Sequence, residues 1–310
     1  MAPMILATDL TRRFGDRLAV DRVSLTVEAG EIFGVVGPDG AGKTTLFRML
    51  AGVLEPTGGC ARIAGLDVLT HPDAIKARIG YMPQGFSLYT DLTVLENLRF
   101  VAEIYAVPRQ AMAARIERLL AFGRMGPFRH RLADHLSGGM KQKLALAATL
   151  IHEPEVIILD EPTTGVDPLS RREFWQILYH LNRQGMTVLV ATPYMDEAER
   201  CSRVALMHQG RILSVDTPDA TRGRMRGVVL EVLATPRWPA LAAARALPEV
   251  LGGTVFGASL HLVVRDLAAA PAVGAALGRA GVTVEAIRPI EASLEDVFVS
   301  LLGRQGPDAS

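Results

Sequence analysis

The stretch GPDGAGKTT, Gly37–Thr45, decides the fold class of this chain. It follows IFGVVG (32–37), a short apolar run typical of a buried strand, and leads into KTTLFRMLAGVL, which has the spacing of a helix. Glycines let the backbone curl so that successive N–H groups face inward, and the helix N-terminus adds partial positive charge. The order strand, glycine-rich loop, helix therefore predicts a phosphate-binding loop rather than an ordinary turn.

The residues of this loop have distinct expected roles. Lys43 is placed to bridge the β- and γ-phosphates of a nucleotide, and Thr44 to hold Mg²⁺ through its hydroxyl. The other nucleotide-binding candidates in the loop are Gly37, Pro38, Asp39, Gly40, Ala41, Gly42 and Thr45. A phosphate loop by itself leaves kinases, GTPases and many other ATPases open.

A second apolar run, VIILD (156–160), ends in two adjacent carboxylates, Asp160 and Glu161. Asp160 can hold Mg²⁺ directly or through water, and Glu161 can orient or deprotonate an attacking water. The alternative is an acidic N-cap for the next helix. Adjacent carboxylates repel each other, and a strand end that faces a bound metal is one place where that cost is offset.

The stretch LSGGMKQKLALAATLIHEP begins a helix with a second candidate anion site. Ser137 is a good N-cap, and Gly138 and Gly139 leave backbone N–H groups uncovered. One chain hardly needs two phosphate cradles for one nucleotide. We therefore expect this second cradle to close over a nucleotide bound to another subunit. A Ser-capped helix with flexible glycines is the alternative.

These motifs and GVDP, in this order and spacing, resemble those of the nucleotide-binding subunit of an ABC transporter over about residues 4–220. The resemblance implies an α/β fold: a P-loop NTPase (RecA-like) core with an antiparallel β-subdomain and a helical subdomain near residues 88–150. It also implies ATP and Mg²⁺ as cofactors. Two such subunits, identical or different, would sandwich two ATP molecules head to tail.

The resemblance supplies further residue roles. Phe14 resembles the aromatic residue that stacks on adenine, although as a bare sequence feature it is typical of a core residue. Gln84 resembles the glutamine that contacts Mg²⁺ and the attacking water, and it begins the segment that faces the membrane partner. Asp167 resembles the aspartate that links the two composite sites, with turn capping as the competing role.

Three residues depart from the family pattern. Asp39 stands where asparagine is commoner, and unless it points away from the phosphates it should weaken ATP binding. Met140 replaces the usual glutamine but leaves Ser137 and Gly139 intact. Pro193 stands where the family has a histidine that reaches the γ-phosphate, and proline offers neither a side-chain donor nor a backbone N–H.

Two outcomes follow from Pro193. In the first, which we favour, the chain still hydrolyses ATP, but slowly, because Glu161, Gln84 and Lys43 are present. In the second, the site mainly binds ATP, and the 136–140 motif serves the active site of a competent partner subunit. Rescue by the nearest histidines, His180 and His208, is not expected, because His208 lies beyond another strand. Rescue by the adjacent Tyr194 is an open alternative.

The remaining patterns outline two domains. Apolar runs at 32–37, 156–160 and 186–192, separated by helical segments such as 93–123, predict a parallel sheet, and the first 30 residues predict short antiparallel strands. A polar, breaker-rich stretch at 214–227 is interpreted as a linker between an ATP-binding domain (1–220) and a small α+β domain (228–303). The alternation of strands and helices resumes beyond it.

SLEDVF (293–298) in the second domain resembles the closing segment of the bacterial drug- and antibiotic-exporter branch, which pairs with ABC-2 type permeases. A capped amphipathic helix that only packs its own domain is the alternative. The resemblance thus predicts an ATPase subunit that powers multidrug export through a separate ABC-2 type permease. Its expected place is peripheral, on the cytoplasmic side of the inner membrane.

The composition agrees with this expectation. The 310 residues carry 33 basic and 33 acidic side chains, so no whole-chain field favours nucleic acid, and none is expected as a partner. The two cysteines suit a reducing cytosol, and no apolar run approaches the roughly 20 residues of a membrane helix. The alternatives are a soluble ABC-type ATPase without a transport role and an ATP-gated regulatory subunit with a degenerate, slow site.

Overall fold

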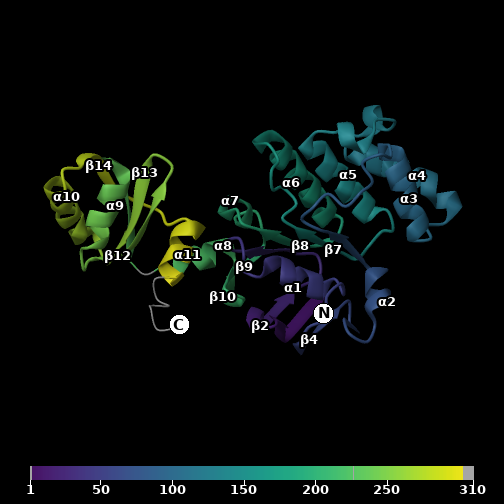
Figure 1. Ribbon diagram of the computed structural model, residues 1–310, viewed down its shortest axis with the longest axis horizontal. Coiled ribbons are helices and arrows are strands. Elements are labelled where there is room, and N and C mark those ends of the chain that lie inside the picture. Colours follow the sequence, from purple (N-terminus) through teal and green to yellow (C-terminus); the bar gives the residue numbers. More distant parts are fainter. Residues whose placement is uncertain (1, 226, 303–310) are drawn as a thin grey trace. The chain divides into compact units, whose positions relative to one another are not determined.

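The computed structural model describes residues 2–225 and 227–302 (Figure 1). Its contacts divide the chain into two compact units that meet between Val215 and Asp216. None of the described helices is long and apolar enough to cross a membrane.

A mainly parallel sheet forms the centre of the first unit, with strand order β10-β9-β3-β8-β7-β6. Parallel pairing joins β9, β3, β8, β7 and β6. Every residue of β3, β7 and β8 is buried, which explains their continuous apolar runs and confirms the predicted parallel sheet. The strands are β3 (Ile32–Val36), β6 (Ile79–Met82), β7 (Val156–Asp160), β8 (Thr187–Thr192), β9 (Arg203–His208) and β10 (Arg211–Asp216).

Helices follow the parallel strands along the chain. After β3 comes α1, after β7 comes α6, and after β8 comes the short α7. Because the carboxyl ends of parallel strands share one edge of a sheet, the loops that precede these three helices meet there. These helices are α1 (Lys43–Leu50), α6 (Pro168–Arg183) and α7 (Met195–Ala198), and a further helix, α2 (Pro72–Lys76), precedes β6.

An antiparallel sheet, in the order β2-β1-β4-β5, packs on the same core and confirms the predicted antiparallel pattern. Its first two strands are 10 and 11 residues long, so the expectation of short strands was wrong. Phe14 pairs with Arg17 at the end of the hairpin that these strands form. The strands are β1 (Ile5–Phe14), β2 (Arg17–Val27), β4 (Gly58–Ile63) and β5 (Leu66–Asp67).

Helices occupy the stretch between β6 and β7. The helical segment expected at 93–123 is two helices, because Ala106 has a φ of +51° and Pro108 then caps the second helix. Thr93 and Glu96 form a capping box at the start of the first one. The elements are α3 (Val94–Ile104), α4 (Arg109–Phe122), η1 (Gly126–Phe128), η2 (Ala133–His135) and α5 (Gly138–Leu150).

The second unit contains an antiparallel sheet in the order β12-β13-β11-β14, with the predicted alternation of strands and helices. Its core includes Leu230, Leu262 and Val273. Gly303, the last residue of the expected second domain, lies outside the described residues. The elements are α8 (Pro218–Gly223), β11 (Val228–Thr235), α9 (Arg237–Arg245), β12 (Val250–Phe256), β13 (Ser259–Val264), η3 (Leu267–Ala269), α10 (Ala270–Arg279), β14 (Thr283–Ile290) and α11 (Leu294–Leu302).

The stretch 214–227, expected to be a linker, contains the boundary between the two units, but most of its residues belong to β10 and α8. Strand β10 continues to Asp216, and α8 follows with Thr217 as its N-cap. The hydroxyl of Thr217 accepts a hydrogen bond from the Ala220 N–H, and Pro218 takes a position in the first turn. The residues that read as breakers are helix-capping residues.

Candidate active site

The phosphate loop packs closely against strands β2 and β9 and the β9–β10 turn. A Cβ on Gly37 would lie 2.1 Å from the carbonyl oxygen of Met207, and one on Gly42, whose φ is +106°, would lie 2.4 Å from that of Ala19. The Gly210 N–H also donates to the carbonyl of Ala41 at 2.8 Å. Glycine is therefore required at 37 and 42 because the backbone of other segments approaches there.

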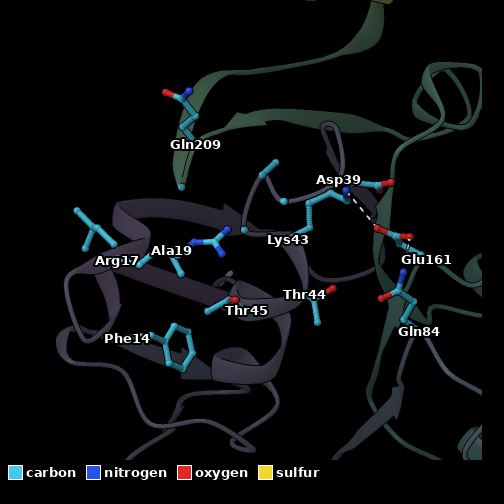
Figure 2. Close-up of a pocket in the computed structure, with 15 residues that line it drawn as sticks. Phe14, Arg17, Ala19, Asp39, Lys43, Thr44, Thr45, Gln84, Glu161 and Gln209 are labelled. Carbon is cyan, nitrogen blue, oxygen red and sulfur yellow. Dashed lines mark hydrogen bonds and ion pairs between the residues drawn. The ribbon is translucent and has the colours of Figure 1, made fainter. Parts of the chain in front are cut away.

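The loop forms the floor of a cleft of about 620 Å³ (Figure 2). Phe14 and Glu161 lie toward its two ends. Gly37 and Pro38 are not among the lining residues, and their carbonyls accept hydrogen bonds from Lys43. The lining residues are Phe14, Arg17, Leu18, Ala19, Asp39, Gly40, Ala41, Gly42, Lys43, Thr44, Thr45, Gln84, Glu161, Gln209 and Gly210.

Five of these residues were missed by the sequence analysis. Arg17, Leu18 and Ala19 belong to the β1–β2 hairpin, and Gln209 and Gly210 to the β9–β10 turn. Because Phe14 lies just before the hairpin turn and Arg17 just after it, the predicted role of Phe14 could have indicated that Arg17 and its neighbours also reach the cleft. No local pattern marks the β9–β10 turn, because it reaches the cleft only through the pairing of β9 with β3.

Lys43 is almost fully buried, and its ammonium group has three oxygen partners. Nζ donates to the carbonyls of Gly37 and Pro38 at 2.8 and 3.0 Å and lies 3.2 Å from Oε1 of Glu161. A charge removed from water is tolerated when it is paired and hydrogen-bonded in this way. Lys43 thus connects the phosphate loop with the end of β7.

Glu161 brings the three predicted catalytic side chains together. Its Oε2 accepts a hydrogen bond from Nε2 of Gln84 at 2.9 Å and one from the hydroxyl of Thr164 at 3.3 Å, while Oε1 faces Lys43. Its backbone is in the left-handed region, with φ +51°, and its N–H donates to the carbonyl of Ala191 on β8. Such a conformation is uncommon in a non-glycine residue and persists only where the surrounding structure fixes it.

Asp160 is fully buried beside the loop. Its Oδ1 accepts a hydrogen bond from the hydroxyl of Thr44 at 3.0 Å, whereas Oδ2 has no hydrogen-bond partner among the described residues. Burial, with a smaller contribution from the charge of Glu161, raises the pKa of Asp160 to about 6 against the opposing effect of the Thr44 hydrogen bond. A buried carboxylate oxygen without a partner, next to a hydroxyl, suits a hard cation.

Phe14 ends β1 at the rim of the cleft. Its side chain is 45% exposed, so the alternative of a core residue was wrong. The guanidinium carbon of Arg12 lies 4.6 Å from the ring centroid. An exposed ring at the far end of the cleft from Glu161 is available to stack on a flat base.

The second predicted cradle lies elsewhere on the same unit. Ser137 caps α5 by accepting a hydrogen bond from the Met140 N–H at 3.3 Å. Ser137 and Gly138 are exposed and do not line the cleft. Gly139 is buried, and a Cβ there would meet Ser170 on α6 at 2.5 Å. The expectation that this cradle serves another subunit stays a prediction.

Two acidic residues of the nucleotide motifs, Asp167 and Asp39, were assigned roles from the sequence, and the structure shows where each one lies. Asp167 caps α6, because its Oδ1 accepts a hydrogen bond from the Ser170 N–H at 2.9 Å, and this bond lowers the pKa of Asp167. The capping alternative is therefore observed, and the link between two sites stays a prediction. Asp39 is exposed at the rim of the cleft, and in the part of the chain that the structure describes Lys43 pairs with Glu161 rather than with Asp39.

Pro193 follows β8 and brings no donor to the cleft. Within the described residues, the cleft lining includes neither Pro193 nor Tyr194 nor His208. The ring of Tyr194 lies against Arg171, whose guanidinium carbon is 4.2 Å from the ring centroid. The geometry therefore does not support the alternative that the Tyr194 hydroxyl takes the role of the missing histidine.

Comparisons with known proteins identify the family of this chain. A family model described as ABC transporter matches residues 20–164. The probable multidrug ABC transporter ATP-binding protein YbhF of Escherichia coli is 43% identical over 99% of this chain, but this chain spans only 53% of that relative. The Nod factor export ATP-binding protein I of Burkholderia lata is 38% identical, with 97% of each chain covered.

Two solved structures and one further relative complete the comparison. An ATP-binding subunit of an ABC transporter superposes with a TM-score of 0.65 at 29% identity, covering 71% of this chain and 92% of that one. A dimeric ATP-binding cassette bound to ADP and Pi gives 0.63 at 26%, covering 69% and 98%. The daunorubicin/doxorubicin resistance protein DrrA of Streptomyces peucetius is 34% identical over 99% of this chain and 94% of its own. The predicted P-loop fold is thereby confirmed, and the chain belongs to the ABC transporter family as one of its ATP-binding proteins.

Proposed function

We propose that this chain is the ATP-hydrolysing subunit of an ABC exporter and works with a separate membrane permease. The observation that carries the proposal is the meeting of Lys43, Glu161 and Gln84 at one end of a cleft floored by a phosphate loop. Phosphoryl transfer to water requires a cation that contacts the phosphate and a carboxylate that activates the water. An amide that orients this carboxylate supports the second role.

We infer that Mg²⁺ binds between Asp160, Thr44 and Gln84. The free, buried Oδ2 of Asp160 and the adjacent Thr44 hydroxyl are oxygen ligands of the kind that Mg²⁺ prefers. When bound there, Mg²⁺ supplies positive charge to the phosphate oxygens. The same charge would favour ionised Asp160, whose pKa burial has raised.

Hydrolysis assigns one task to each side chain. The ammonium group of Lys43 exchanges the carbonyls of Gly37 and Pro38 for phosphate oxygens, which neutralises charge on the transferred group. Glu161 accepts a proton from the attacking water while the oxygen of that water bonds to the γ-phosphorus. The bond between the γ-phosphorus and the bridging oxygen breaks, and ADP leaves with that oxygen. Gln84 holds Oε2 of Glu161 in place and thereby orients the carboxylate.

The function proposed here needs a second ATP-binding subunit, identical to this one or different. Support comes from the exposed start of α5, where Ser137 and Gly138 present backbone N–H groups outside the cleft of their own chain. A helix start of this kind, presented to a nucleotide on the partner, would complete each site. The dimeric ATP-binding cassette among the structural relatives has the same fold.

The export direction and the ABC-2 type permease rest on the relatives and on SLEDVF. YbhF, the Nod factor protein and DrrA are named for multidrug handling, Nod factor export and drug resistance respectively. We accordingly propose residues 1–220 as the ATPase domain and 228–303 as an accessory domain. The place of action would be the cytoplasmic side of the inner membrane, through the permease.

Pro193 favours a second candidate, an ATP-gated regulatory subunit with negligible turnover. Removal of one donor that stabilises the transferred phosphate costs about 10²–10³-fold in rate. The two candidates differ in steady-state turnover and agree in ATP binding.

The test uses the full chain purified alone and together with a candidate ABC-2 type permease. We expect ATP hydrolysis that requires Mg²⁺ and is lost in Lys43→Ala, with Lys76→Ala as the control because Lys76 is exposed on α2. Co-purification with the permease from detergent is expected as well. Hydrolysis that survives in Lys43→Ala would contradict the site, and a chain that never associates with the permease would contradict the transport role.

A further inference from the structure

Glu197 is a fully buried carboxylate on α7 that the mechanism above does not use. It lies outside the cleft lining, and nothing in its motif predicts a role. Burial of a carboxylate is costly unless its oxygens are satisfied, so its partners indicate what holds it there.

The two oxygens of Glu197 join two different loops. Oε1 accepts a hydrogen bond from the hydroxyl of Thr163 at 2.5 Å, and Oε2 accepts one from the hydroxyl of Thr192 at 2.7 Å. Thr163 follows Glu161 by two residues, and Thr192 directly precedes Pro193. One side chain on α7 therefore connects the loop after β7 with the end of β8.

Arg171 on α6 supplies the opposite charge. Its Nε lies 3.6 Å from Oε1 of Glu197, beyond hydrogen-bond distance but close enough for an ion pair. Its guanidinium group lies over the ring of Tyr194, and the Tyr194 N–H donates to the Thr192 hydroxyl at 3.1 Å. Residues on both sides of Pro193 are thus anchored by side chains, although Pro193 itself offers no N–H.

The position of Glu161 depends on both loops. Its left-handed backbone conformation is strained, and its N–H donates to Ala191, the residue before Thr192. A strained conformation persists only where the surroundings fix it from several directions. The Thr163 and Thr192 hydrogen bonds fix the chain two residues after Glu161 and one residue after its backbone acceptor.

We propose that Glu197 is a positioning residue for hydrolysis: through Thr163 and Thr192 it holds the carboxylate of Glu161 in register with Lys43 and Gln84. The proposal rests on the proposed function, in which Glu161 accepts the proton of the attacking water. It assigns Glu197 no contact with the nucleotide. Loss of the anchor should therefore lower kcat and leave the KM for ATP unchanged.

The test compares Thr163→Val with Thr163→Ser in the full chain. Valine has the shape of threonine without the hydroxyl, and serine keeps the hydroxyl. We expect kcat about 10-fold lower in Thr163→Val, since small misplacements of a catalytic group carry costs of this order, with KM within about 2-fold. Thr163→Ser should restore kcat to within about 2-fold of the original. All rates are measured well below the Tm of each variant.

A double-mutant cycle with Glu161→Gln separates positioning from a general structural role. If Thr163 acts through Glu161, Thr163→Val should cause no further loss in the Glu161→Gln background. Glu197→Gln should reproduce the kcat effect, and Glu155→Gln, a half-exposed acid just before β7 that does not contact the anchor, should not.

An unchanged kcat in Thr163→Val, or an equal loss of kcat in the Glu161→Gln background, would overturn the positioning role while leaving the proposed function intact. If the unmodified chain with its permease shows no hydrolysis, the proposed function fails and the positioning role fails with it.

Discussion

Two neighbouring strands, β7 and β8, end at the same edge of the central sheet and deliver different groups to it. Both strands are fully buried and pair in parallel register, with Asp160 opposite Ala191. Beyond β7, Glu161 turns into the cleft and meets Lys43 and Gln84. At the end of β8, the Thr192 hydroxyl donates to Glu197, and Pro193 after it offers no donor.

The difference shows that position at the edge of a sheet does not by itself make a residue catalytic. The end of β7 carries charge that is balanced by partners from the phosphate loop. The end of β8 is fixed by hydrogen bonds on the side of α7. The site therefore has the carboxylate and the amide that we propose act on water, and at position 193 it has proline where the family pattern has a histidine. Four substitutions test this comparison.

The largest effect is expected for Glu161→Gln. Removal of a general base costs about 10²–10⁴-fold in rate, so ATPase activity of the complex with the permease should fall by that factor and an ATP-bound dimer should accumulate. Glu155→Gln, a half-exposed residue just before β7, serves as the control. Steady-state phosphate release and gel filtration with ATP measure the two effects, and an unchanged rate would refute the role of Glu161.

Pro193→His should act in the opposite direction. A histidine after β8 adds the donor that the family has there, and turnover should rise by up to about 100-fold. Pro193→Ala restores a backbone N–H without an imidazole and should leave the rate within about 3-fold of the original if the side chain is what matters. Equal gains in both variants would locate the effect in the backbone instead.

Asp160→Asn tests the buried acid at the end of β7 by its dependence on pH. Burial raises the folded-state pKa of Asp160 to about 6, above its usual 3.8, so its ionisation opposes folding. The folded state favours the protonated form of Asp160. This contribution to stability is complete below pH 3.8 and is lost as the pH rises through 6. With EDTA and without nucleotide, Asp160→Asn should be about 2 kcal/mol more stable at pH 8 and about equal at pH 4, by urea unfolding. Equal stability at both pH values would contradict the shift.

The smallest effect is expected for Tyr194→Phe. The ring packs on Arg171 and does not line the cleft, so loss of the hydroxyl should change kcat by less than about 2-fold. Tyr194→Ala, which also loses the contact with Arg171, should lower kcat more. A loss of 10-fold or more in Tyr194→Phe would mean that its hydroxyl replaces the missing histidine.

Many of the candidate site residues at the carboxyl edge of the central sheet could be predicted from the sequence, because they belong to short contiguous motifs. The loop around Lys43 and the pair Asp160–Glu161 follow short apolar runs that are typical of buried strands. Arg17 and Gln209 could not be predicted, because their place in the cleft depends on the hairpin and on strand pairing. The capping residues of α8 were interpreted as part of a linker, because Thr, Pro and Asp occur in both.

The sequence by itself determined the family, the phosphate loop, the acid pair and the absence of a histidine at 193, since each is a matter of residue type and spacing. Only the tertiary structure decided that Gln84 orients Glu161, that Phe14 is exposed at the cleft and that Glu197 joins Thr163 to Thr192. These contacts join residues from separate segments, and a hydrogen bond of about 3 Å exists only after the sheet has brought the segments to one edge.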